Sequence, residues 1–126
     1  MMSSKNINIA FGSVFVLVGV LGFIPNPLVS SEGIFEVNAM HNLVHLLTGT
    51  AFLFGGLVLT GKEQWTLQVV TAAYFGVALL GFLTNGNTLL GLVHINEADR
   101  WLHLGLAIGM LGAAVLSTSR VSQLAR

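Results

Sequence analysis

Four long runs of apolar residues constrain the fold of this chain more than any other feature. The runs span approximately 7–24, 42–60, 65–84 and 101–118, and each approaches the roughly 20 residues that an α-helix needs to cross a bilayer. Only 8% of the residues are charged, against about 25% in a soluble domain, so the chain cannot cover a surface that faces water. The sequence therefore predicts an all-α integral membrane protein that forms a four-helix bundle in the lipid bilayer, with one domain over 1–126.

Basic and acidic residues lie in different connecting segments. The basic residues of both termini and of the central loop share one side, and the acidic residues of the two longer loops share the other. The first group is Lys5, Lys62, Arg120 and Arg126; the second is Glu32, Glu36, Glu97 and Asp99, opposed only by Arg100. Cytoplasmic loops of membrane proteins are enriched in Lys and Arg, so we expect both termini in the cytoplasm. The zero net charge gives no reason to expect a nucleic-acid partner.

A segment of the sequence occurs twice. Residues 33–45 align without a gap with residues 91–103, and a glycine, an asparagine and a final histidine are identical in the two copies. The likeness continues into the preceding helices, where 15–26 resembles 74–85. We therefore predict two tandem two-helix repeats, about 7–60 and 65–118. Both copies insert in the same direction, so a pseudo-two-fold axis would run along the membrane normal, with the second and fourth helices meeting near it.

Small residues predict where helices approach each other. Gly105, Gly109 and Gly112 share the last helix, and Gly49 lies on the second with a glycine pair at 55–56. Small residues mark helix contacts in membranes, where lipid removes most of the hydrophobic drive for association. These positions predict a tightly packed protein that could also form a homo-oligomer or join a larger membrane complex.

The histidines of the chain all belong to the repeated motif. An i, i+4 spacing stacks His41 on His45 in one copy and Asp99 on His103 in the other. If the two faces converge, His45 and His103 would be the core ligands of a metal ion. His41 and Asp99 would be secondary ligands, and two loop residues would be outer ligands of the same site. Those loop residues are Glu36 and His94. Nitrogen and oxygen donors suit zinc, copper or iron, and the absence of cysteine excludes thiolate ligands. We therefore predict a small membrane protein that binds a transition metal ion.

Several other interpretations of the same residues remain open. Asn38 and Asn96 stand where N-caps are expected, and Asn96 with Asp99 resembles a capping box. His45 and His103 could donate structural hydrogen bonds between helices, handle protons, or ligate haem from opposite sides. An accessory subunit of a larger membrane complex, holding haem or a pigment, is the main alternative function. No nucleophile–base pair or substrate pocket can be recognised, so a membrane redox enzyme or a transporter ranks third.

The paired motifs resemble the two signatures of an uncharacterised bacterial family of small four-helix membrane proteins, one of the domains of unknown function. Residues 41–49, beginning with the HNxxH pattern and preceded by 35–38, resemble the first signature. Residues 96–105, which include a DxxLH pattern, resemble the second. The resemblance covers nearly the whole chain and implies the four-helix fold and a bacterial inner membrane, without implying an activity or a cofactor. Arg100 stands where a smaller polar residue is expected in that pattern.

Overall fold

The computed structural model describes residues 2–124, with side chains described over 2–117. Within this range it contains four helices, as predicted. They are α1 (Ser4–Leu21), α2 (Ala39–Leu57), α3 (Glu63–Leu83) and α4 (Glu97–Leu124). Four two-residue strands lie in the two longer loops: β1 (Val29–Ser30), β2 (Phe35–Glu36), β3 (Thr88–Leu89) and β4 (Val93–His94). β1 pairs with β2 in parallel and β3 with β4 antiparallel, so the two loops differ in detail.

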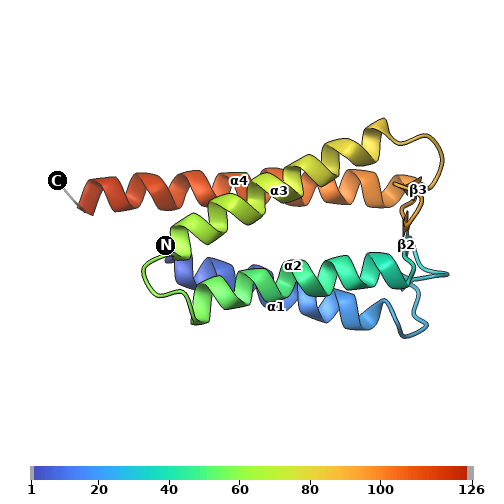
Figure 1. The fold of residues 1–126 in the computed structure, drawn as a ribbon, viewed down its shortest axis with the longest axis horizontal. Helices are drawn as coiled ribbons and strands as arrows, with labels where there is room; N and C mark the ends of the chain where they lie inside the picture. Colours follow the sequence, from blue (N-terminus) through green and yellow to red (C-terminus); the bar gives the residue numbers. More distant parts are fainter. Residues whose placement is uncertain (1, 125–126) are drawn as a thin grey trace.

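The helices are arranged as two pairs. α1 packs along α2, and α3 packs along α4 (Figure 1). α1 begins and α4 ends at one end of the molecule, while all four strands lie at the other end (Figure 1). The backbones of α2 and α4 approach each other closely at fewer positions than those of α2 and α3. The second and fourth helices therefore meet through side chains, and His41 and His45 of α2 contact His103 of α4 near the strands.

Among the described residues, three helices are long and apolar enough to cross a membrane: α1, α3 and the Glu97–Ser117 part of α4. This composition is consistent with a membrane protein. α2 has 19 residues but carries His41, Asn42 and His45 in its first two turns, and these polar residues lower its hydropathy. That α2 also crosses the membrane stays a prediction.

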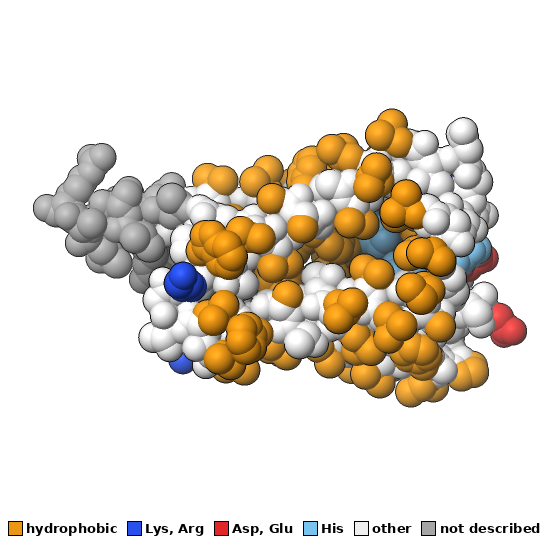
Figure 2. Space-filling view, in the orientation of Figure 1, with side chains coloured by type: hydrophobic (Ala, Val, Ile, Leu, Met, Phe, Trp, Pro, Cys, Tyr) orange, Lys and Arg blue, Asp and Glu red, His pale blue; other side chains and the backbone are white. Residues whose placement is uncertain are grey.

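Charge and hydrophobicity are distributed along the long axis of the molecule. In Figure 2, hydrophobic side chains spread over the visible side, Lys and Arg lie toward one end, and Asp and Glu lie at the other. Lys5 and Lys62 belong to the end where α1 begins. The side chain of Arg120 and all of Arg126 lie outside the described residues. Which end faces the cytoplasm stays a prediction.

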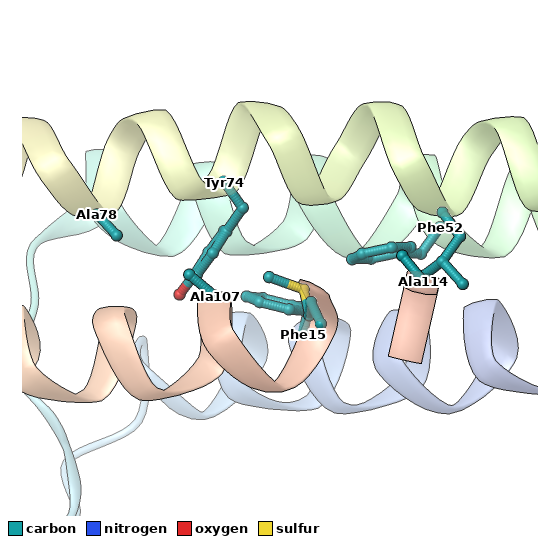
Figure 3. Packing of buried hydrophobic residues seen from close by; sticks show 8 residues of the cluster. Phe15, Phe52, Tyr74, Ala78, Ala107 and Ala114 are labelled. Atoms are coloured by element: carbon teal, nitrogen blue, oxygen red, sulfur yellow. The ribbon is translucent and has the colours of Figure 1, made fainter. Parts of the chain in front are cut away.

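A cluster of buried hydrophobic side chains from all four helices fills the middle of the molecule (Figure 3). Phe15 of α1 is central to it, with ring centroids 6.1 Å from Phe52 of α2 and 5.2 Å from Tyr74 of α3. α4 contributes Ala107 and Met110, neither of which is exposed. The cluster separates the strand end, where the histidines lie, from the end that carries the lysines.

Glycines bring α1 and α2 into backbone contact, but they do not position α4. A Cβ atom added to Gly12 would lie 2.9 Å from the carbonyl oxygen of Gly49, and one added to Gly49 would lie 2.8 Å from that of Gly12. The predicted contact at Gly49 is thus confirmed. A Cβ added to any of the three α4 glycines would meet no atom within 4 Å. Their predicted contact is wrong within this chain, because α4 packs through Ala107 and Met110 instead.

Candidate metal site

Two asparagines start the helices that carry the histidines. Asn38 precedes α2, and its side-chain oxygen accepts a hydrogen bond from the backbone N–H of His41 at 2.9 Å. Asn96 precedes α4 and accepts from the N–H of Asp99 at 3.0 Å, while the Asp99 carboxylate accepts from the N–H of Asn96 at 3.0 Å. This reciprocal pair is a capping box. Both predicted N-caps are confirmed, and they place the histidines within the first two turns of α2 and α4.

Three histidines converge at the strand end of the hydrophobic core. His41 and His45 come from α2 and His103 from α4, and one ring nitrogen of each lies within 4.8 Å of the others. The ring centroids of His41 and His45 are 4.4 Å apart, as expected for i, i+4 neighbours, and His41 lies 5.3 Å from His103. All three are buried, with 2–7% of their surface exposed. The predicted convergence of the two motifs is confirmed for these three residues, which are called the triad below.

Hydrogen bonding orients one member of the triad and leaves another without a partner. Nδ1 of His41 donates to the backbone carbonyl of His94 at 2.6 Å. Because a carbonyl only accepts, this nitrogen carries the proton and Nε2 keeps its lone pair. Nδ1 of His45 is buried and has no hydrogen-bond partner in the described part of the chain. A structural hydrogen-bond network therefore accounts for His41 but not for His45.

The three other predicted ligands make different contacts. Glu36 of β2 and His94 of β4 form a partly exposed pair, with Oε2 and Nε2 2.9 Å apart. Asp99 is buried, and its carboxylate closes the capping box. None of the three is among the donors gathered within 4.8 Å. Their role as ligands stays a prediction.

Arg100 binds the end of a neighbouring helix. Its Nε donates to the carbonyl of Gly81 at 2.8 Å, a second nitrogen donates to the carbonyl of Gly86, and a third lies 3.2 Å from Glu97. Cations are favourable near the carbonyl end of a helix. The guanidinium therefore links α4 to the end of α3 and to the loop that follows it.

A cavity of about 180 Å³ adjoins the triad. Its walls include the three histidines, Tyr74 of α3 and apolar side chains from α2, α3 and the β3–β4 loop. In Figure 2 a hollow in the side of the molecule has histidine at its base and hydrophobic side chains around it. Figure 3 shows Tyr74 extending from α3 toward α4.

Tyr74 is the residue of this cavity that sequence reasoning missed. It is 5% exposed, and its ring centroid lies 5.7 Å from that of His103. Its hydroxyl is buried and finds no hydrogen-bond partner in the described part of the chain. The available signal was chemical, since Tyr74 is the single tyrosine of the chain and places a hydroxyl in the otherwise apolar stretch 72–83. In the aligned repeats Tyr74 is equivalent to Phe15, and this equivalence indicates no hydrogen-bonding role.

One family model matches the chain. It is described as "Domain of unknown function (DUF4383)" and matches residues 5–116. No curated protein and no solved structure matches the sequence. The match covers most of the chain, and the chain belongs to this family. Membership of an uncharacterised family is thus confirmed, while the bacterial origin and the paired signatures stay predictions.

Proposed function

We propose that this member of the DUF4383 family is a small membrane protein that binds a transition metal ion through His41, His45 and His103. The observation that carries the proposal is the convergence of three buried imidazoles, with one nitrogen of each within 4.8 Å of the others. Buried polar groups are costly without partners, and Nδ1 of His45 has none in the described residues. Ionisable side chains inside membrane proteins commonly mark functional sites.

The dimensions of the triad fit a metal after a small adjustment. A zinc–imidazole bond of about 2.0–2.1 Å places two nitrogens of a tetrahedral site roughly 3.4 Å apart. The separations of at most 4.8 Å would close to this value with side-chain movements of about 1 Å. The hydrogen bond from His41 to the carbonyl of His94 is the kind of outer contact that orients metal-binding histidines.

The donor set and the cavity favour zinc or copper. Three imidazoles suit both ions, whereas iron in oxygenases is commonly held by two histidines and a carboxylate. The nearest buried carboxylate, that of Asp99, is engaged in the capping box. A cavity of about 180 Å³ is smaller than the roughly 300–1,000 Å³ of most organic-ligand pockets. The space therefore favours an ion over haem or a pigment.

Paired contacts support the proposed tandem repeat. The Asn38 side chain donates to the carbonyl of Leu92 at 2.9 Å, and the Asn96 side chain donates to the carbonyl of Ile34 at 2.9 Å. These donors and acceptors occupy equivalent positions in the aligned segments. A pseudo-two-fold axis between the halves would relate both pairs, as it would relate His45 to His103. The third imidazole, His41, stands where the second copy has Asp99, so the metal would lie off the axis.

The test is elemental analysis of the protein purified in mild detergent without a histidine tag. We expect about one zinc or copper per chain in the wild type and less than about a tenth of that in a variant carrying both His45→Ala and His103→Ala. Leu47→Ala is the matched control, because Leu47 lies on the same helix as His45 but is 69% exposed; this variant should keep the metal. Circular dichroism checks that the helices persist. A wild type without bound metal would contradict the proposal.

A second candidate is an accessory subunit of a membrane complex. The observation that favours it is the open face of α4, where Gly105, Gly109 and Gly112 have no neighbour within 4 Å of an added Cβ and where Ile108 and Leu116 are each 57% exposed. Small residues let a second helix approach closely in membranes. Native mass spectrometry would show a stoichiometric partner or a second copy; a lone chain in mild detergent would count against this function.

A further inference from the structure

We infer that the metal bound by the triad keeps one open coordination position toward the cavity, where it binds a small uncharged molecule of a few non-hydrogen atoms that accepts a hydrogen bond from Tyr74. This inference rests on the proposed metal site. It adds the class of ligand and the residue that recognises it.

The cavity gives the ligand a defined size. The triad forms part of its wall, so an ion held by the three imidazoles would lie beside this space. Three protein ligands with an open fourth position are typical of metal sites that bind exogenous molecules. A water molecule takes up about 30 Å³ in the liquid, and the cavity volume is about 180 Å³. Several non-hydrogen atoms fit, but a large cofactor does not.

Tyr74 lines the same cavity. Its hydroxyl is buried and has no hydrogen-bond partner among the described residues, which costs free energy unless a ligand accepts a hydrogen bond from it. The residue comes from α3, whereas the triad comes from α2 and α4. Its ring packs edge-on to His103, with centroids 5.7 Å apart. Three helices therefore surround the space between the triad and the phenol.

The rest of the cavity wall favours an uncharged ligand. Val44, Val77, Leu89, Leu90 and Val93 line it, and no Lys or Arg side chain of the described residues is among them. An anion would lose its hydration there without gaining a cationic partner beyond the metal. Leu90 is 79% exposed, so the wall is continuous with the hydrophobic side of the molecule (Figure 2). Small uncharged molecules also dissolve in the lipid that would face this side.

Carbon monoxide bound to Cu(I) is a suitable probe. The detergent-purified protein is loaded with Cu(I) without oxygen, and carbon monoxide is added while its stretching frequency is recorded by infrared spectroscopy. We expect one carbon monoxide per copper in the wild type. Tyr74→Phe should keep the copper, raise the stretching frequency and weaken carbon monoxide binding about fivefold, because one hydrogen bond to the ligand is lost.

A second pair of variants tests the cavity. Val77→Phe places a larger side chain in the cavity wall, and it should keep copper while losing carbon monoxide binding. Val69→Phe is the matched control, because Val69 lies on the same helix but is 44% exposed. This variant should keep both copper and carbon monoxide binding.

The possible outcomes separate the two proposals. A wild type that takes up no copper overturns the metal site and this inference together. Copper without carbon monoxide binding overturns the inference alone. Loss of copper in Tyr74→Phe, or an unchanged frequency and affinity in that variant, overturns the role of Tyr74 as the hydrogen-bond donor.

Discussion

His41 and Asp99 occupy equivalent positions of the two repeated segments, yet their side chains make different contacts. Each follows the N-cap asparagine by three residues. The Asp99 carboxylate turns back to the N–H of Asn96, because free N–H groups at a helix start attract a negative charge. An imidazole gains little there, and His41 contacts His45, His103 and the His94 carbonyl instead. The difference between histidine and aspartate at this position therefore decides that α2, and not α4, supplies the third imidazole of the triad.

The Asn38 side chain makes three hydrogen bonds that substitutions can separate into two groups. Its oxygen accepts from the N–H groups of His41 and His94, and its nitrogen donates to the carbonyl of Leu92. We expect Asn38→Ala to lower the free energy of unfolding in detergent by about 2 kcal/mol, since all three hydrogen bonds are lost. Asn38→Asp keeps the acceptor and should cost only about 1 kcal/mol. Equal losses in denaturant titrations of the two variants would mean that the hydrogen bonds accepted by the Asn38 oxygen contribute nothing.

At the scale of the elements, two glycine faces behave differently. α1 and α2 touch through Gly12 and Gly49, where a carbonyl of each helix lies against the other glycine. The glycines of α4 face open space, and that helix joins the core through Ala107 and Met110. Glycine spacing therefore predicts that a second helix can pack closely against this face. The positions of the larger side chains decide whether a helix of the same chain packs there.

This difference predicts opposite responses to the same substitution. Gly49→Val should destabilise the protein by about 2–3 kcal/mol, because even its first added carbon would lie 2.8 Å from backbone atoms of α1. Gly109→Val is the matched variant and should change the free energy of unfolding by less than about 0.5 kcal/mol, since its added Cβ meets nothing within 4 Å. Thermal unfolding in detergent compares them. A large loss of stability in Gly109→Val would contradict the open surroundings of this glycine.

At the scale of the whole molecule, the two helix pairs are linked at the strand end. The Asn38 and Asn96 side chains each donate to the opposite loop, and Glu36 pairs with His94 across the same boundary. The first turns of α2 and α4 are thereby held near each other, which keeps the triad together. Since α1 begins and α4 ends at the far end (Figure 1), both chain ends are expected on one side of the membrane.

The absence of cysteine allows the predicted orientation to be tested with single substitutions. Glu32→Cys lies in the first long loop and Lys62→Cys in the central loop, and both positions are exposed. A maleimide that cannot cross membranes should label Glu32→Cys in intact cells, but should label Lys62→Cys only after lysis. The enrichment of basic residues on the cytoplasmic side is the physical reason. The reverse labelling pattern would place both termini outside.

Much of this protein follows from local sequence patterns. The apolar runs predict the four helices because burying backbone polar groups in lipid requires helical hydrogen bonding. Asn38 and Asn96 mark two helix starts because an asparagine oxygen accepts from the free N–H groups of a first turn. The i, i+4 spacing likewise predicts that His41 and His45 share a face. These features depend on neighbours within a few residues of one another.

The tertiary structure alone decided which candidate ligands come together. His103 joins His41 and His45 only because α2 and α4 are brought together at the strand end, and Asp99 is drawn into capping instead. Tyr74 reaches the same cavity from a third helix, a relation that no local spacing contains. Side-chain direction across helices depends on how the helices pack, so the triad and its cavity required the tertiary structure, whereas the helices and their caps did not.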